Sequence, residues 1–419
     1  MNVRLALALV ALAGCAGPAA NPPPATVAAE GPTCAWESVL GDTDLGLSDR
    51  NASYLWSWFA LEPGDEILVQ GRFPHARYAS FVVQDQDGAV VDSLDDVQIL
   101  PERGRNPFTP SAPRSGADLG GYLLRVSSEA LPAGGRAPNT LYSGRTLKGE
   151  PNRLILLNYR NYLTDRRYSR SAGHPLWVTG GVGAPALSVR RNGVVQPCPE
   201  PGVARAAWRA RQPSTAEQTR GVSAVPGATE ARNPPAWTHS ERKTARATNK
   251  LGPNDSTVYT SVPLSARFGD FILFRWTPPT APIETYEGRP FPARSDVRYW
   301  SISFMYKHPT ATDFGGIRTE RTVADHEVPR RPDGSSLLVL GLGGRPRPDF
   351  VPPEQWVGVS FREGSAMVRE IMTAPDYAGD VGRLPRGLVP PEYQRVIPGG
   401  VYLNEAQLRA ALGAGAERS

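Results

Sequence analysis

One segment of this chain occurs twice, and this repeat limits what the chain can fold into. The first copy is residues 51–83, NASYLWSWFALEPGDEILVQGRFPHARYASFVV. The second begins at Asn254 with NDSTVYTSVPLSARFGDFILFRW and, after a proline-rich insertion at Thr277–Val297, continues with VRYWSISFMY. The matched positions are Asn51-x-Ser53 with Asn254-x-Ser256, Gly64-Asp65 with Gly269-Asp270, and Arg77-Tyr78-x-Ser80 with Arg298-Tyr299-x-Ser301. Their common order predicts two related modules in one chain.

Both copies have the pattern of β structure. Short runs of aromatic and β-branched residues recur, and Gly and Pro, 42 of each among 419 residues, separate them. We therefore predict a mainly β fold with two tandem related β-sandwich or jelly-roll-like modules and a few short helices. The expected segments are a lipoprotein signal peptide (1–14), a flexible tether (15–31), a first β module (32–202), a basic connector rich in Pro, Ala and Arg (203–251), a second β module (252–413) and a tail (414–419).

Few segments favour helix. Ala204–Gln212 is a candidate short helix, and Asn404–Leu412 is another with Asn404 as its N-cap. Ser365–Met372 is a third, because its apolar residues lie near one side of a helix. The polar stretch Tyr159–Arg170 is expected to be a helical or looped insertion.

The N-terminus has the features of an export signal. Arg4 precedes the apolar run Leu5–Ala13, which is too short to cross a bilayer as a helix of about 20 residues. Leu12-Ala13-Gly14-Cys15 resembles the lipobox of bacterial lipoproteins, which implies cleavage before Cys15 and a lipid on its thiol. An ordinary signal peptide followed by a cysteine is the alternative. Ala16, rather than Asp, resembles outer-membrane sorting, so we expect an extracytoplasmic lipoprotein, in the outer membrane if the cell has one.

The net charge of +5 is concentrated in the connector. Between Arg205 and Lys250, nine basic residues stand against three glutamates, a net charge of +6. The rest of the chain is near neutral, so the basic composition does not indicate a nucleic-acid partner. The expected partners are instead the membrane, through the N-terminal lipid, and an envelope polymer or small-molecule ligand.

Three cysteines are present, and one of them is Cys15. Cys34 and Cys198 lie near the two ends of the first module, and an exported protein meets an oxidising compartment in many bacteria. We expect these two to form a disulfide; two free thiols are the alternative.

No motif in the sequence assigns a reaction. It contains no GxSxG elbow, no HExxH and no phosphate loop, and its five histidines lack the spacing of a metal site, so we expect no metal and no cofactor. The SxxK match at Ser240–Lys243 lies in the basic connector. Asp85-x-Asp87-Gly88 begins like a calcium loop but lacks the later ligands, so a hairpin turn is expected.

Polar residues in the repeated region are the candidate binding site. His75, Arg77, Asp96 and Asn106 lie in or beside the segments GRFPHARYAS, LDDVQI and RNPF, and Arg298 takes the place of Arg77 in the second module. Arg77 is expected to pair with Asp96 on the neighbouring strand, with no matching Asp-Asp pair in the second module. The set either fixes strand register or forms a pocket for an anionic or sugar ligand.

Three aromatic residues share a strand face in the first copy of the repeat. Tyr54, Trp56 and Trp58 alternate along this strand. They are either core packing or a platform for a sugar.

Several of these segments together carry a resemblance. GRFPHARYASF, VDSLDDVQI, RNPF and DVRYWSISF are similar to segments of a family of uncharacterised bacterial secreted proteins and lipoproteins. The resemblance implies a two-module β architecture outside the cytoplasm. It implies no activity and therefore no catalytic residues.

These patterns leave the activity open. The first hypothesis is a lipid-anchored, non-enzymatic protein whose β modules bind a ligand or envelope partner. The alternative is a carbohydrate- or lipid-active enzyme with a polar site in the first module that uses acids such as Asp95 or Asp96. A structural envelope protein whose connector contacts anionic lipid or polymer is the third hypothesis.

Overall fold

The computed structural model describes residues 33–39, 49–169, 179–211, 230–240, 256–308 and 317–416. Cys15, the tether and most of the connector lie outside these ranges, as does part of the SxxK match. The β-strands of the first module are β1 (Glu37–Val39), β2 (Ala52–Ala60), β3 (Asp65–Arg72), β4 (Ala76–Gln84), β5 (Val90–Asp95), β6 (Gly121–Ser127), β7 (Thr140–Tyr142), β8 (Leu154–Thr164), β9 (Ala186–Arg191) and β10 (Val194–Gln196).

The second module is also built of strands. They are β11 (Thr238–His239), β12 (Thr257–Ser265), β13 (Phe271–Trp276), β14 (Tyr299–Lys307), β15 (Ile317–Ala324), β16 (Ser336–Gly341), β17 (Trp356–Gly358), β18 (Glu363–Ile371), β19 (Gly387–Leu388) and β20 (Gly399–Leu403). The described α-helices are α1 (Pro201–Arg211) and α4 (Glu405–Ala416), close to the expected short helices. The Asn404 side chain accepts a hydrogen bond from the Gln407 N–H at 2.9 Å, which confirms the predicted N-cap.

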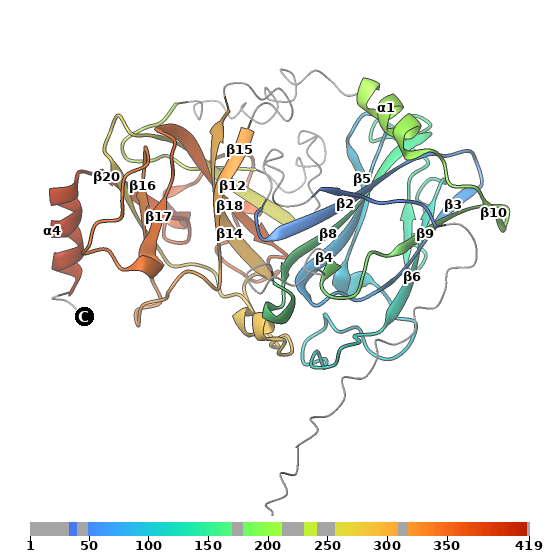
Figure 1. The fold of residues 1–419 in the computed structure, drawn as a ribbon, viewed down its shortest axis with the longest axis horizontal. Coiled ribbons are helices and arrows are strands. Elements are labelled where there is room, and N and C mark those ends of the chain that lie inside the picture. The colour runs from blue at the N-terminus through green and yellow to red at the C-terminus, as the bar shows by residue number, and fades with distance from the viewer. Residues whose placement is uncertain are drawn as a thin grey trace, which may run out of the picture.

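The two modules share one sheet topology. In the first module the sheets have the orders β1-β2-β8-β4-β5 and β10-β9-β3-β6-β7, and in the second β15-β14-β18-β12-β11-β19 and β17-β16-β13-β20. Thus β2-β8-β4-β5 corresponds to β12-β18-β14-β15, and β9-β3-β6-β7 corresponds to β20-β13-β16-β17. Figure 1 shows the two modules side by side. The predicted fold of two related β modules is confirmed.

Each module buries an apolar core between its two sheets. The first core includes Ile67, Phe81 and Leu157, and the second includes Ile272 and Phe304. Each of these side chains is at most 1% exposed. The alternation of inward and outward side chains along the strands therefore places the predicted apolar faces inside two sandwiches.

The predicted helix at Ser365–Met372 is wrong, because Glu363–Ile371 is strand β18 at the centre of its sheet. Ala366 and Val368 face the sandwich core, whereas Ile371 faces the first module. A strand buried on both faces has apolar residues at successive positions, and this pattern resembled a helical stripe. The insertion expected at Tyr159–Arg170 is also wrong. Leu154–Thr164 is strand β8, which is buried along its whole length although its second half carries polar side chains, and a turn of 3-10 helix follows at Arg166–Tyr168.

The register of the repeat differs from the sequence match at its first position. Tyr54 pairs with Arg160, and Tyr259 pairs with Arg369. The same register makes Asn51 equivalent to Ser256, since their carbonyls accept hydrogen bonds from Leu163 and Met372 respectively, both at 2.7 Å. The Asn-x-Ser match was therefore shifted by two residues. Leu163 and Met372 also share a left-handed backbone, with φ of 48° and 51°.

The aromatic residues of β2 lie on the outer face of the first sandwich. Trp58 is 2% exposed and packs with Trp56 against Trp208 of α1. Tyr54 packs at the boundary between the modules. These residues are covered by other parts of the chain, so they form no open platform for a sugar.

The turn at Asp85–Gly88 connects β4 to β5, as predicted. Asp85 Oδ1 accepts hydrogen bonds from the N–H groups of Asp87 and Ala89, both at 2.9 Å, and Gly88 has a φ of 81°. The carboxylate thus serves the turn, and glycine supplies its positive φ.

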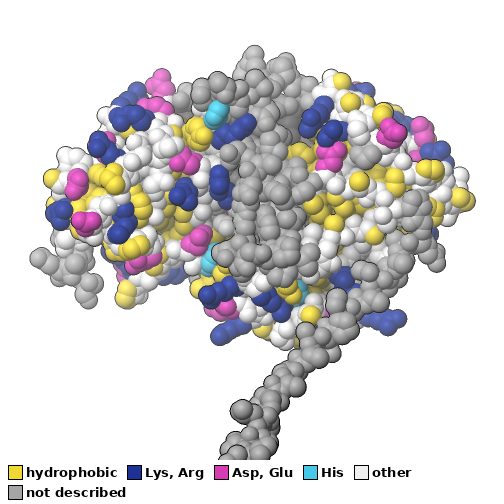
Figure 2. All heavy atoms as spheres, viewed as in Figure 1, with side chains coloured by type: hydrophobic (Ala, Val, Ile, Leu, Met, Phe, Trp, Pro, Cys, Tyr) yellow, Lys and Arg dark blue, Asp and Glu magenta, His cyan; other side chains and the backbone are white. Residues whose placement is uncertain are grey.

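The surface carries mixed charges. On the face shown in Figure 2, basic and acidic side chains are interspersed over both modules. Within the described ranges no helix has the length and apolarity needed to cross a membrane.

Cys34 and Cys198 lie at disulfide distance, with Cα atoms 5.2 Å apart, in agreement with the expected pairing. Cys34 also forms an isolated bridge with Leu187 of β9. A disulfide between these residues is typical of an oxidising compartment.

Because this disulfide closes a loop of 164 residues, we expect its removal to lower the free energy of unfolding by about 4–5 kcal/mol. Urea denaturation of Cys34→Ser, Cys198→Ser and the double variant measures this. The three variants should be equally destabilised, since each lacks the same covalent link. Additive losses in the double variant would show that the cysteines act separately.

Candidate functional site

The repeated arginines form an exchanged pair of contacts across the boundary between the modules. Arg77 lies in β4, and its Nη1 donates to Asp325 Oδ2 of the second module at 2.8 Å. Arg298 lies directly before β14, the equivalent of β4, and its Nη1 lies 3.7 Å from Asp96 Oδ1 of the first module. Asp96 follows β5 and Asp325 follows β15, so the two aspartates are also equivalent. Each module therefore supplies an arginine to the other's aspartate.

The backbone holds both aspartates in the same way. The Ala79 N–H donates to Asp96 Oδ2 at 2.8 Å, and the Trp300 N–H donates to Asp325 Oδ2 at 3.4 Å. Ala79 and Trp300 are each two residues after the arginine of their own module. This common anchoring places a buried carboxylate at the same end of each sandwich.

The predicted pairing of Arg77 with Asp96 is wrong. Arg77 lies at the start of β4 and reaches Asp325 of the other module. The second module has no Asp-Asp pair, as expected, because Ala324 stands where the first module has Asp95, but Asp325 fills the place of Asp96. The repeat contained this signal, because an acidic residue follows the equivalent strand in both copies.

Two further buried carboxylates connect the modules. Asp49 Oδ2 accepts hydrogen bonds from Arg369 Nη1 at 2.8 Å, Tyr299 Oη at 3.0 Å and Ser301 Oγ at 2.6 Å. Asp95 accepts hydrogen bonds from Tyr78 Oη of its own module and Ser256 Oγ of the second. Such donors are what a carboxylate needs to remain buried.

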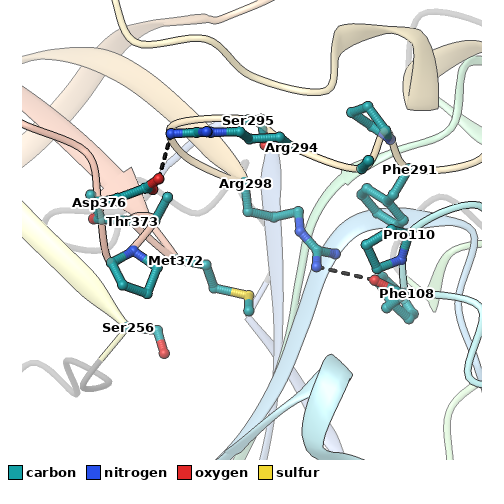
Figure 3. A pocket seen from close by; sticks show the side chains of 14 residues that line it. Phe108, Pro110, Ser256, Phe291, Arg294, Ser295, Arg298, Met372, Thr373 and Asp376 are labelled. Atoms are coloured by element: carbon teal, nitrogen blue, oxygen red, sulfur yellow. Dashed lines mark hydrogen bonds and ion pairs between the residues drawn. The ribbon is translucent and has the colours of Figure 1, made fainter.

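A cavity of about 590 Å³ lies at this boundary (Figure 3). Its lining comes from both modules: Phe108, Pro110, Ser256, Phe291, Pro292, Ala293, Arg294, Ser295, Arg298, Met372, Thr373, Ala374, Pro375 and Asp376. Much of the lining belongs to the insertion Thr277–Val297, which the sequence marked only by its prolines. Apolar walls with a few charged groups are typical of small-molecule sites.

The insertion also closes one side of the first module. Phe291 is 4% exposed and packs in the core of the first module, and its carbonyl accepts a hydrogen bond from Ser111 N–H at 2.8 Å. The guanidinium carbon of Arg298 lies 4.0 Å from the centre of the Phe291 ring. Arg298 Nη2 donates to the Phe108 carbonyl at 3.1 Å. Arg298 is thus held between an aromatic ring and a backbone acceptor.

A second arginine lies at the rim of the cavity. Arg294 forms an ion pair with Asp376, and both side chains are largely exposed, at 75% and 61%. Figure 3 shows this pair on one side of the cavity and Arg298 beside Phe108 on the other. No motif surrounds Arg294 or Asp376, and Ser256 stands in the sequence only as part of the repeated Asn-x-Ser pattern, so none of the three was a predicted site residue.

Burial shifts the pKa values of Asp96 and Arg298, the exchanged pair beside the cavity. It raises the pKa of Asp96 from an ordinary 3.8 to about 7, although the Arg298 guanidinium and the Ala79 N–H favour the charged form. Burial likewise lowers the pKa of Arg298, and Asp96 opposes that shift. The buried pair therefore contains a carboxyl group that takes up a proton near neutral pH.

His75 and Asn106, which were also expected at the site, contact other residues of the chain. His75 is fully buried, with its Nδ1 2.6 Å from Arg167 Nη2 and 3.7 Å from Asp165 Oδ2. Asn106 Nδ2 donates to the carbonyls of Asp96 and Ile99, at 2.7 and 2.8 Å. Of the five expected binding residues, only Arg298 lines the cavity. Asn106 instead holds the chain beside Asp96.

The described part of the chain contains no group of three His, Cys, Asp or Glu side chains arranged to hold a metal ion. His239, His308 and His326 are separate from one another in the fold: His239 lies in β11, His308 directly follows β14 and His326 directly follows Asp325.

Comparison with known proteins identifies a similar fold in a protein without an assigned activity. No protein-family model matches the sequence, and no curated protein matches it. The crystal structure of an uncharacterised protein from Burkholderia cenocepacia is similar over 84% of this chain and 79% of that one, with a TM-score of 0.51 and 15% identity. A structure from Vibrio parahaemolyticus covers 85% of this chain and 90% of its own, with a TM-score of 0.44 and 11% identity. The first likeness extends over both modules and concerns the fold alone.

The raised pKa of Asp96 predicts a pH-dependent stability. Between pH 3.8 and about 7 the folded chain keeps a proton on Asp96 that the unfolded chain has lost, so stability falls as pH rises. The slope from this group is at most about 1.4 kcal/mol per pH unit, and it ends near the folded pKa. Asp96→Asn lacks this slope. Urea unfolding of both proteins across this range measures the difference, and parallel curves would contradict the prediction.

Proposed function

We propose that this protein is an exported, lipid-anchored binding protein without catalytic activity, and that its ligand is a small molecule in the cavity between the modules. The observation that carries the proposal is the cavity itself, because residues of both modules line it and two of these are arginines. A site at a module boundary is common for small ligands. The lipobox and the cysteine pair support a location outside the cytoplasm.

The arrangement of acids favours binding over hydrolysis. A glycosidase of the usual type needs two carboxyl groups on either side of its substrate. Asp95 and Asp96 are 9% and 0% exposed and hold contacts between the modules. Among the described lining residues the one carboxylate is Asp376, and it is paired with Arg294. This set suits recognition of a ligand better than acid–base chemistry on it.

A ligand screen with a cavity-blocking variant tests the binding site. The chain from Pro32 onward, which includes every described residue, is melted against metals, envelope glycans, lipids and small anions. A ligand at about 100 times its Kd adds about 2.7 kcal/mol of stability. We expect Ala293→Trp to abolish this shift, since exposed Ala293 lines the cavity and a bulky ring would occupy it.

The matched control is Ala137→Trp, which adds the same ring at an exposed position that does not line the cavity. It should keep the ligand-induced shift. Equal shifts in both tryptophan variants would place the ligand elsewhere, and no shift with any compound would overturn the proposal of a small-molecule ligand.

The lipid anchor is tested at Cys15. Cys15→Ser removes the thiol that would carry the lipid, so we expect the protein to incorporate no radiolabelled palmitate in cells and to move from the membrane pellet to the soluble fraction. Ala16→Ser, which alters the next residue but keeps the thiol, should remain labelled. Membrane attachment of Cys15→Ser equal to that of the native chain would show that the anchor is not this lipid.

A further inference from the structure

We propose that the cavity takes a small carboxylate with an apolar body, that Arg298 binds the carboxylate, and that Asp96 releases Arg298 by taking up one proton from solvent. This inference rests on the proposed function, because it names the ligand class of the same cavity. It assigns Arg298 as the group that contacts the ligand and Asp96 as a residue that acts through Arg298.

The first observation is that the two equivalent ion pairs differ. The pair that does not line the cavity is closed, since Arg77 Nη1 and Asp325 Oδ2 are 2.8 Å apart and both side chains are 1% exposed. The pair at the cavity is open, with 3.7 Å between Arg298 Nη1 and Asp96 Oδ1. Within the described residues neither of these two atoms has a hydrogen-bond partner. Arg298 therefore retains donor capacity that its equivalent has used.

The second observation is the position of Arg298 in the cavity. Its side chain is 11% exposed and lines the cavity, whereas Arg77 does not. In Figure 3 its guanidinium lies between the Met372 side chain and Phe108. A guanidinium binds a carboxylate through two parallel hydrogen bonds, and partial burial strengthens them. Phe108, Phe291 and Met372 offer apolar surface for the body of the same ligand.

The charges around the cavity favour one added anion. Arg294 and Asp376 at the rim neutralise each other. Asp96 faces Arg298, which directly precedes β14, Asp95 at the end of β5 and, at longer range, the buried Arg114. If Asp96 stayed ionised, a carboxylate bound to Arg298 would be repelled by Asp96 as well as by Asp95. Protonation at Asp96 Oδ1 removes the repulsion from Asp96 and leaves Arg298 to the ligand.

The balance of this step is one proton gained for each carboxylate bound. No bond between heavy atoms changes, and the proton comes from solvent. Because burial brings the pKa of Asp96 to about 7, this carboxyl group can take up a proton near neutral pH. Binding should therefore weaken as pH rises, and the measured proton uptake should approach one at high pH.

Isothermal titration calorimetry of the chain from Pro32 onward tests this inference with probes of matched shape: phenylbutanoate, phenylbutanamide and phenylbutylamine, together with hexanoate. We expect the carboxylates to bind at least about tenfold more tightly than the amide and the amine at about pH 6. Affinity for phenylbutanoate should fall several-fold by about pH 8. Titrations in two buffers of different ionisation enthalpy measure the protons taken up.

Variants separate the roles of the two residues. Arg298→Gln should lose the preference for carboxylate over amide, and Arg298→Lys should keep part of it. Asp96→Asn should bind phenylbutanoate more tightly at about pH 8, by about tenfold, without proton uptake or pH dependence. Asp325→Asn is the matched control, because it removes the equivalent carboxylate in the closed pair and should leave the proton uptake unchanged. Melting curves of each variant verify folding.

Three results would overturn the inference. They are no binding by any carboxylate, equal binding of carboxylate and amide to the native chain, and unchanged proton uptake in folded Asp96→Asn. If Ala293→Trp still blocks a ligand from the screen while carboxylates show no preference, the proposed function stands and this inference fails. If no compound binds the cavity, both fail.

Discussion

The boundary between the two modules depends on carboxylates that are buried in one module and receive donors from the other. Asp49, Asp95, Asp96 and Asp325 are all at most 9% exposed. Removing such charges from water costs several kcal/mol each unless partners replace the solvent. Arg369, Arg77, Arg298 and Ser256 are these partners, and each lies across the boundary from its carboxylate. Separation of the modules would therefore leave charged groups without partners, so the two sandwiches form one unit.

The exchange of arginines follows from duplication of one module. Equivalent strands meet at the boundary, so an arginine and an aspartate at equivalent positions in each copy can satisfy each other twice. Aromatic and aliphatic side chains fill the space between these pairs, among them Tyr78, Tyr162, Tyr299 and Ile371. This packing lowers the local dielectric constant, which strengthens the ion pairs and raises the cost of leaving one incomplete.

The insertion Thr277–Val297 breaks the equivalence of the two halves. It places Phe291 in the core of the first module and Arg294 at the rim of the cavity, and it leads directly into Arg298. The result is one closed pair and one open pair at equivalent positions of the two modules. The first module supplies an internal reference for the second. Arg77 and Asp325 form a closed ion pair, whereas the equivalent residues Arg298 and Asp96 lie further apart beside the cavity.

The β class, the repeat and the turn at Asp85–Gly88 could be predicted from the sequence, because short-range alternation and turn chemistry are local properties. The repeat also marked Arg77 and Arg298 as equivalent. The sequence did not reveal that β18 is a strand, because burial on both faces removes the alternation that would indicate one. The partners of the two arginines were likewise beyond the sequence, because an ion pair between modules depends on how separate sheets pack. The cavity could not be predicted from the sequence either, because Phe108, Arg298 and Met372 are distant in the chain and meet only when both modules are folded and joined.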